Sequence, residues 1–357
     1  MSKVIVGMSG GVDSAVAAYL LKIAGYEVSG LTIRIWISSD GKDSRCCEID
    51  DARRTAMLLD IPYYVQNSVA EFNERVTRPF VNDYICGLTP NPCIECNRYV
   101  KWGRMLETAD LMHAEYVATG HYANIIHLDN GRYTVKTAIH AEKDQTYMLY
   151  RLTQEQLKRT IMPLGGLSKE EVRNIARKVG LDVADKADSQ EICFVPEGKY
   201  TDYIEENAEV EVPGEGNFVD EDGKVLGKHK GIIHYTIGQR KGLGIALGRP
   251  IFVKKINAST NEVVLADETA LYSTKIICRK LNFLSIEEPE IGEKVEARVK
   301  IRYHHSPQKA VVEMLGEDRA MVSFEEPVRA ATPGQSAVFY DDEDCVIGGG
   351  LIVEVME

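Results

Sequence analysis

We expect an α/β protein with a doubly wound parallel sheet at the N-terminus, a small, mostly β central domain and a C-terminal antiparallel β-barrel. Three observations predict this fold class. Strand and helix patterns alternate over the first 200 residues, residues 212–231 are rich in turn formers, and short alternating runs fill the remainder. A chain of 357 residues is also too long for one ordinary core. We therefore expect three domains, at 1–204, 205–272 and 273–357.

The N-terminal elements follow from hydrophobic periodicity. The apolar run Val4–Met8 predicts a strand. The apolar residues between Val12 and Ile23 recur at three- and four-residue steps, as they do on one face of a helix. The same pattern predicts strands at 27–36, 63–66 and 116–119 and a helix at 50–59. Strands that alternate with helices are typical of a parallel sheet.

The C-terminal part has a different sequence pattern. Short runs of alternating polar and apolar residues are separated by Gly, Asp, Asn and Pro, which is typical of antiparallel β structure. These runs lie at 251–256, 262–267, 294–303, 309–315, 319–324, 336–341 and 345–355. We expect them to close into a small barrel at the C-terminus.

Composition limits the classes of function. No apolar run approaches the roughly 18–20 residues of a membrane span, and the first residues lack the features of an export signal. We therefore expect a cytoplasmic protein with no membrane partner. The eight cysteines are irregularly spaced, which favours reduced thiols over a disulfide framework. A net charge of −12 argues against nonspecific coating of nucleic acid but allows a local basic groove.

The segment MSGGVDS (8–14) lies between the first predicted strand and the first predicted helix. Its two glycines let the backbone turn and bring N–H groups to an anion at the positive end of the helix. Ser9 and Ser14 can donate hydrogen bonds, and Asp13 is a candidate ligand for Mg²⁺. The segment matches neither the Walker nor the dinucleotide pattern. It resembles the pyrophosphate loop of ATP pyrophosphatases, which predicts ATP binding.

Cys93 and Cys96 form a Cys-x-x-Cys pair, and Cys193 lies far from them in a second polar, glycine-containing context. Three thiols beside a phosphate loop suggest sulfur chemistry. With these residues the chain resembles, nearly end to end, the bacterial tRNA-specific 2-thiouridylases, which replace the C2 oxygen of the wobble uridine with sulfur. The matching stretches are GMSGGVDS (7–14), TPNPxxxCN (89–97), ATGHYA (118–123), KDQTYMLY (143–150), DSQEICFV (188–195), GQRKGLGI (238–245) and PGQ (333–335).

The resemblance implies a role for each matching position. Cys193 would carry sulfane sulfur as a persulfide, and Cys96 would be the partner thiol that assists release and closes an alternative disulfide with Cys193. ATP would be bound by Gly7, Met8, Ser9, Gly10, Gly11, Val12, Asp13 and Ser14, with the backbone near Ile33 and Gly120. The tRNA would be contacted by Asn91, Pro92, Cys93, His121, Lys143, Asp144 and Gln145, and by Arg302, Tyr303 and Gln335 of the C-terminal domain.

General chemistry supports these roles for the cysteines and for the ATP-binding and tRNA-binding residues. The C2 oxygen of uridine is a poor leaving group, so it must first be adenylated, with Mg²⁺ and backbone donors absorbing phosphate charge. A thiolate or persulfide then attacks, helped by nearby basic groups that lower its pKa. An unpaired anticodon base also suits reading by a protein better than a paired one.

The sequence departs from the family pattern at Cys93, where many members carry Asp. Cys93, Cys96 and Cys193 therefore offer an alternative in which they ligate a 4Fe–4S cluster whose fourth iron binds sulfide. A structural zinc site would want a fourth ligand. For Cys46 and Cys47, and for Cys86, Cys278 and Cys345, we predict no role.

Two other functions remain open. One is an amide-forming ATP pyrophosphatase, which needs ammonia and no thiol pair. The other is an RNA-binding protein that senses redox state without turnover. For the thiouridylase we expect tRNA and a sulfur donor as partners. That donor is a cysteine desulfurase, a sulfur-relay protein or free sulfide.

Overall fold

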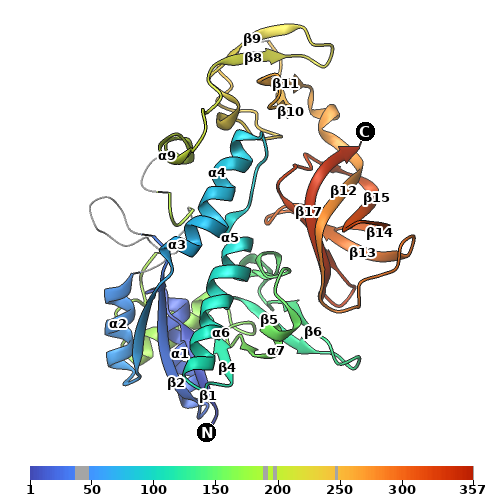
Figure 1. Cartoon of the computed structure of the whole chain (residues 1–357). Helices are drawn as coiled ribbons and strands as arrows, with labels where there is room; N and C mark the ends of the chain where they lie inside the picture. Colours follow the sequence, from blue (N-terminus) through green and yellow to red (C-terminus); the bar gives the residue numbers. More distant parts are fainter. Residues whose placement is uncertain (37–47, 188–191, 196–198, 246–247, 357) are drawn as a thin grey trace.

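A computed structural model describes residues 1–36, 48–187, 192–195, 199–245 and 248–356. The chain forms a parallel α/β domain at the N-terminus, a small four-stranded sheet in the middle and a closed barrel at the C-terminus (Figure 1). The helical column that contains α4, α5 and α6 runs from the central sheet down to the parallel sheet. The predicted fold class is confirmed.

The N-terminal sheet has the strand order β3-β2-β1-β4-β7, and its paired strands are parallel. Its strands are β1 (Lys3–Gly7), β2 (Glu27–Arg34), β3 (Tyr63–Asn67), β4 (Tyr116–Ala118) and β7 (Thr160–Ile161). The order reverses between β1 and β4, so the loops that follow these two strands open into one crevice at their carboxyl ends. Doubly wound folds bind ligands at this point.

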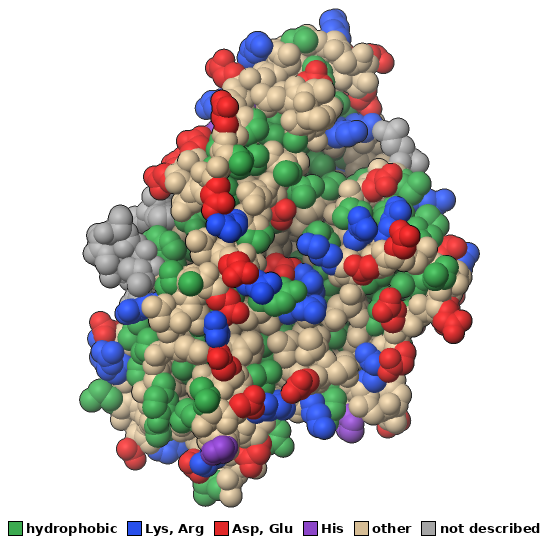
Figure 2. Space-filling model, viewed as in Figure 1, with side chains coloured by type: hydrophobic (Ala, Val, Ile, Leu, Met, Phe, Trp, Pro, Cys, Tyr) green, Lys and Arg blue, Asp and Glu red, His purple; other side chains and the backbone are tan. Residues whose placement is uncertain are grey.

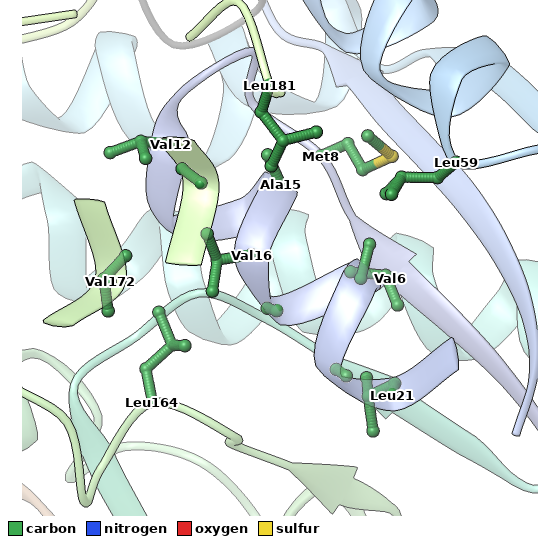
Figure 3. Close-up of a cluster of buried hydrophobic side chains, with 14 of the residues drawn as sticks. Val6, Met8, Val12, Ala15, Val16, Leu21, Leu59, Leu164, Val172 and Leu181 are labelled. Atoms are coloured by element: carbon green, nitrogen blue, oxygen red, sulfur yellow. The ribbon is translucent and has the colours of Figure 1, made fainter. Parts of the chain in front are cut away.

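Helix α1 (Val12–Ile23) begins directly after the first loop and confirms the predicted helix. Its apolar face is buried against residues that come much later in the chain. Figure 3 shows Val12, Ala15 and Val16 pointing toward Leu164, Val172 and Leu181. Fully burying a valine or leucine side chain contributes about 1.5–3 kcal/mol. This packing therefore fixes α8 (Lys169–Val179) beside the loop at residues 8–11.

Two helical stretches in the middle of the domain contain π-helical turns. The first comprises α3 (Val69–Phe72), the π turn Asn73–Thr77 and α4 (Arg78–Ile85); the second comprises α5 (Pro92–Glu95), the π turn Cys96–Lys101 and α6 (Trp102–Leu111). Such turns are rare and occur often at functional sites. The remaining helices are α2 (Ile49–Leu58), α7 (Gln154–Lys158) and α9 (Tyr200–Asn207), with short 3-10 turns at Ala141–Lys143, Thr146–Met148, Ile232–His234 and Glu268–Leu271.

The central sheet has the order β10-β11-β8-β9, and the C-terminal strands close in the order β12-β15-β14-β13-β16-β17. The central strands are β8 (Gly216–Val219), β9 (Val225–His229), β10 (Phe252–Asn257) and β11 (Glu262–Ala266). The barrel strands are β12 (Tyr272–Phe283), β13 (Lys294–Lys300), β14 (Gln308–Gly316), β15 (Arg319–Arg329), β16 (Ser336–Tyr340) and β17 (Val346–Met356).

A hairpin joins the barrel to the N-terminal domain. It consists of β5 (Ala123–His127) and β6 (Tyr133–Thr137), which the sequence patterns did not predict. The Arg132 guanidinium donates to the carbonyl oxygens of Phe283 and Leu284 at 3.0 and 2.9 Å. The Thr134 hydroxyl donates to the Val346 carbonyl at 2.6 Å. The barrel is thereby attached beside the crevice. Within the described residues, no helix is long and apolar enough to cross a membrane.

Candidate nucleotide and sulfur-transfer site

The loop between β1 and α1 is shaped by its own side chains. Gly10 has φ +81°, and a Cβ atom there would lie 2.5 Å from the Glu48 carbonyl oxygen, so only glycine fits. The Ser14 hydroxyl donates to the Gly11 carbonyl at 3.0 Å and accepts from the Ser9 N–H at 3.2 Å. No side chain caps α1 at Gly11, so the first N–H groups of the helix face the loop. This arrangement can hold a phosphate group.

The other residues expected at ATP gather around this loop. A Cβ atom on Gly120 would lie 2.7 Å from the backbone of Asp13 and Ser14, so the loop after β4 touches the first turn of α1. Met8 is buried beneath them, where its carbonyl accepts the Thr32 hydroxyl at 2.7 Å. Ile33 lies on the neighbouring strand β2. The sequence-predicted nucleotide residues therefore meet at one edge of the sheet.

Asp13 has partners that the sequence did not suggest. Lys169, at the start of α8, places its Nζ 2.8 Å from both carboxylate oxygens of Asp13. The Tyr122 hydroxyl donates to the same carboxylate at 2.7 Å. Lys169 thus forms an ion pair with Asp13 in the structure. No local pattern could have predicted this pair, because 155 residues separate the two side chains and only the α1–α8 packing brings them together.

Two asparagines of the TPNPxxxCN stretch (89–97) contact Met148 in the KDQTYMLY stretch (143–150). The Asn91 side chain caps α5 by accepting from the Cys93 N–H at 3.1 Å, and its amide contacts the Met148 sulfur at 3.3 Å. Asn97 is buried and donates to the Met148 carbonyl at 3.0 Å. Pro92 occupies the first turn of α5, where a missing N–H costs nothing. These contacts fix the backbone that carries Cys93 and Cys96.

The turn at Lys143, Asp144 and Gln145 is largely engaged with the protein itself. Asp144 is buried and accepts from the Thr146 hydroxyl at 2.7 Å; burial raises the pKa of its carboxyl group. The Gln145 side chain accepts from the Tyr122 N–H at 3.0 Å. Gln145 therefore holds the backbone of Tyr122, whose hydroxyl contacts Asp13. This turn is thereby connected to the phosphate loop.

The three predicted thiols differ in their surroundings. Cys93 is accessible to solvent, yet the protein around it raises the pKa of its thiol, while the nearby Lys101 ammonium opposes this shift. Cys96 is 5% exposed and belongs to a packed cluster against which Cys193 also lies. None of the three forms a disulfide within the described residues. Cys46 and Cys47 lie outside the described residues.

Phe194 anchors the segment that carries Cys193. Its ring is buried, with centroids 5.5 Å from Phe72, 5.3 Å from Phe80 and 5.2 Å from Tyr203. Aromatic pairs at such distances contribute about 0.5–1.5 kcal/mol beyond their buried area. The preceding residue, Cys193, is thereby held against the cluster that contains Cys96.

The comparisons with known proteins agree over the full length. Residues 2–197 match the tRNA methyl transferase HUP domain family, residues 201–267 its PRC-barrel domain, and residues 273–352 the aminomethyltransferase beta-barrel domain. The tRNA-specific 2-thiouridylase MnmA of Lachnoclostridium phytofermentans is 53% identical, covering 99% of this chain and 100% of that protein. The chain belongs to the tRNA-specific 2-thiouridylase family.

Other relatives carry the same name. The thiouridylase MnmA of Clostridium perfringens is 52% identical over 99% of each chain. Among solved structures, the U34-tRNA thiolase NcsA from Methanococcus maripaludis with its [4Fe-4S] cluster is 20% identical, with a TM-score of 0.35, covering 58% of this chain and 67% of that one. Membership of the thiouridylase family therefore rests on the full-length relatives and the domain matches.

His121 lies where the thiouridylase pattern expects contact with the target base. Its ring nitrogen Nδ1 is 2.8 Å from the Thr119 hydroxyl, and its centroid is 5.5 Å from that of Trp102. Burial, and secondarily the Lys101 ammonium, lowers the pKa of His121 to about 3. The imidazole is therefore neutral near pH 7 and can contribute hydrogen bonds but not a positive charge.

Two of the barrel residues expected at tRNA, Arg302 and Gln335, form hydrogen bonds at the domain junction. Arg302 Nη2 donates to the Ile237 and Ala330 carbonyl oxygens at 2.9 and 3.0 Å. Gln335 donates to the Thr89 carbonyl at 2.7 Å, at the start of the segment that carries Cys93 and Cys96. Arg302 and Gln335 therefore connect the barrel to the neighbouring domains. Their sequence motifs alone do not show whether such side chains contact the protein or RNA.

Tyr303 is different, because its half-buried ring faces the N-terminal domain. It lies 6.2 Å from the Tyr147 ring, and Lys300 approaches its face at 5.9 Å. Burial, with smaller contributions from Asp144 and Cys93, raises the pKa of its hydroxyl. Tyr303 is therefore close enough to Cys93 for the two groups to interact. Lys and Arg side chains gather on the visible face where the barrel meets the N-terminal domain (Figure 2).

We expect Arg302→Ala to destabilise the domain junction, because it removes the Nη2 donor from the Ile237 carbonyl and leaves the Ala330 carbonyl with the Thr332 hydroxyl as its donor. Loss of such a donor costs about 1–3 kcal/mol. The midpoint of thermal unfolding should fall by several degrees relative to Lys309→Ala, a barrel residue whose side chain is exposed. If Arg302 instead contacts phosphate, the melting point should stay constant while the salt dependence of tRNA binding decreases.

Proposed function

We propose that the chain catalyses ATP-dependent 2-thiolation of the wobble uridine in tRNA. The observation that carries the proposal is that one domain holds both a phosphate loop at the sheet's switch point and two thiols, Cys96 and Cys193, in one packed cluster. An amide-forming pyrophosphatase would have no use for the thiols, and a redox sensor would have no use for the loop.

The first step is adenylation. The C2 oxygen of the uridine attacks the α-phosphorus of ATP, the bond from that phosphorus to the bridging oxygen breaks, and pyrophosphate leaves with Mg²⁺ as its counterion. Residues 8–11 and the N-terminus of α1 donate N–H groups to the phosphates. Lys169 supplies positive charge from the opposite side of Asp13. This step converts the C2 oxygen into a good leaving group.

The second step transfers sulfur. The outer sulfur of a persulfide on Cys193 attacks C2, and AMP leaves with the C2 oxygen. The Cys96 thiolate then attacks the sulfur of Cys193, which closes a disulfide and releases the thiouridine with the electron pair of the broken S–S bond. A dithiol reductant restores the two thiols. A cysteine desulfurase or relay protein would supply the persulfide. Free sulfide, the alternative donor, would instead attack the adenylated C2 directly and displace AMP, with no persulfide or disulfide formed.

The base is proposed to lie beside Cys93. Asn91 and Pro92 precede Cys93 at the start of α5, neutral His121 would offer a hydrogen bond, and Tyr303 would approach from the barrel. The turn at Lys143, Asp144 and Gln145 is proposed to contact the tRNA next to the base. Arg302 and Gln335 are proposed to contact the tRNA from the barrel, besides the hydrogen bonds that they make at the domain junction.

A 4Fe–4S cluster would need the thiolates of Cys93, Cys96 and Cys193 around one centre. In the described part of the chain, no three Cys, His, Asp or Glu side chains come together at a spacing that fits a metal ion. Cys93 is exposed, whereas Cys96 is buried in the aromatic cluster. The residues as arranged do not fit the cluster, and we derive no step through it.

We expect Cys93→Asp to keep thiolation activity within about threefold of the wild type in air, with iron chelated, because many members of the family carry Asp at this position. The measurement is thiouridine per enzyme by nucleoside mass spectrometry, with iron and acid-labile sulfide determined in parallel. Cys86→Ser, which changes another exposed thiol, is the matched control. Loss of activity together with bound iron in Cys93→Asp would favour the cluster.

The proposed function is tested by incubating the purified protein with ATP, Mg²⁺, an unmodified tRNA transcript, a cysteine desulfurase with cysteine, and a dithiol. We expect 2-thiouridine at the wobble position and release of pyrophosphate only when tRNA is present. A transcript with cytidine at the wobble position should yield neither product. Pyrophosphate release that requires ammonia and no tRNA would support an amide-forming enzyme instead.

A further inference from the structure

Three arginine side chains surround the ring of Tyr99, which lies in the π turn between α5 and α6. The guanidinium carbons of Arg75, Arg98 and Arg151 lie 5.6, 5.3 and 5.9 Å from the centre of that ring. Arg75 comes from the π turn between α3 and α4, and Arg151 directly follows the stretch at 143–150. A guanidinium group within about 6 Å of an aromatic ring is attracted to its face. Tyr99 therefore gathers positive charge from three segments of the chain.

The carboxylates near this ring offset only part of the positive charge. Glu95 pairs with Arg151, whose side chain is 10% exposed. Glu74 lies 3.7 Å from Arg75, and both side chains are more than half exposed, so water screens this pair. In the described part of the chain, no carboxylate pairs with the Arg98 guanidinium. A chain with a net charge of −12 thus keeps an excess of positive charge at this place.

The arginines differ in how firmly the protein holds them. Arg151 is buried between Glu95 and the Tyr99 ring. The Gln156 side chain donates to the Arg98 carbonyl at 3.0 Å, which fixes the backbone there, while the Arg98 side chain stays partly exposed. The Arg75 side chain is 52% exposed. A ligand from solvent can therefore reach Arg75 and Arg98 over a fixed base.

This cluster lies beside the thiols of the candidate site. Cys96 begins the same π turn, and Tyr99 packs against the buried cluster that contains Cys96. Cys93 precedes Arg98 by five residues in the same helical stretch, which corresponds to about 7 Å along the helix axis. A nucleotide whose base lies beside Cys93 carries a phosphate group on each side. Such a phosphate would be within reach of the Arg98 side chain.

We infer that Arg75 and Arg98 bind the phosphate backbone of the tRNA next to the wobble nucleotide, with Tyr99 as the platform for their guanidinium groups. The inference rests on the proposed function and adds two residues to its tRNA site. A planar guanidinium group can donate two parallel hydrogen bonds to phosphate oxygens, and the release of counterions from the RNA favours the contact. RNA is favoured over an acidic protein because the cluster adjoins the position proposed for the base.

The test measures tRNA binding by filter retention at several salt concentrations for Arg75→Ala, Arg98→Ala and the double variant. We expect each single variant to bind about three- to tenfold more weakly at low salt, and to lower the slope of log K against log salt by about 0.7–0.9, the value of one phosphate contact. The double variant should lose about twice that slope. The loss should be equal for a transcript with cytidine at the wobble position, because phosphate contacts do not read the base.

The same variants should raise the KM for tRNA and leave the yields of pyrophosphate and thiouridine at saturating tRNA within about twofold of the wild type, because the contact is made before and during the reaction alike. Arg177→Ala is the matched control: its side chain is 49% exposed and also pairs with a carboxylate, but it lies on α8. Its salt slope should equal that of the wild type. Arg98→Lys keeps the charge and should keep most of the slope.

Should Arg98→Ala fail to fold, Arg98→Gln removes the charge from a side chain of similar length and should lower the slope likewise. An unchanged salt slope in the double variant would overturn the inference. Unchanged tRNA affinity together with a higher KM for the desulfurase would also overturn it, and would assign the cluster to an acidic protein. A wild type that binds tRNA yet forms no thiouridine would instead overturn the proposed function, while the salt slopes would still decide the inference.

Discussion

Cys193→Ser is expected to abolish thiouridine formation, with a loss of at least about 10³-fold, because a serine hydroxyl cannot carry sulfane sulfur. Pyrophosphate release that depends on tRNA should continue for at least one turnover, because Cys193 lies in the aromatic cluster rather than at the phosphate loop. The two products are measured by nucleoside mass spectrometry and by a phosphate-release assay with pyrophosphatase. Cys86→Ser should behave as the wild type.

Cys96→Ser should stop the same reaction one step later. Without the Cys96 thiolate, the disulfide between Cys193 and the base persists, so we expect a covalent protein–tRNA adduct on non-reducing gels that a reductant dissolves. Cys193→Ser should form no such adduct. Equal thiouridine yields from wild type and Cys193→Ser would contradict the roles proposed for both thiols.

Asp13→Ala should produce the second large effect. It removes the carboxylate that holds Lys169 and the Tyr122 hydroxyl at the phosphate loop, and it leaves the Lys169 ammonium without its partner. We expect a loss of about 10²–10³-fold in the rate of pyrophosphate release, comparable to removal of a preorganised electrostatic group. Binding of tRNA, measured by filter retention, should change little. Asp182→Ala, an exposed aspartate beyond α8, is the matched control.

Unchanged pyrophosphate release by Asp13→Ala would remove this ion pair from the mechanism. Loss of tRNA binding and pyrophosphate release together would place Asp13 in the RNA surface. Lys169→Ala should reproduce the loss of pyrophosphate release, since the two side chains form one pair.

Local patterns predicted the N-terminal elements well. Helix α1 has the expected bounds, and strands β1 to β4 lie within two residues of those predicted, because alternating apolar runs and helical steps are local properties. Strand β12 escaped prediction. Its burial pattern does not alternate, because it pairs with both β15 and β17 and shifts register along its length. The closure of the barrel is therefore encoded in partners that no short window contains.

The residues of the candidate site likewise divide into those that a local sequence pattern predicts and those that it does not. Gly10 and Ser14 belong to one continuous stretch, so their chemistry could be predicted from the chain alone. Lys169 could not, because its partner Asp13 is distant in sequence and meets it only after α8 packs on α1. Arg302 is expected at tRNA, and in the structure its Nη2 also donates to carbonyl groups at the junction. A basic residue in a motif does not indicate whether its partner is RNA or the protein itself.

The most direct test of the account is a single turnover with labelled sulfur. The protein is loaded with ³⁴S-persulfide on Cys193, freed of the donor, and mixed with unmodified tRNA with or without ATP. We predict that the label appears in 2-thiouridine only with ATP, and that one pyrophosphate is released for each labelled base. Labelled thiouridine formed without ATP, or unlabelled thiouridine formed from the loaded protein, would contradict the proposed order of activation and sulfur transfer.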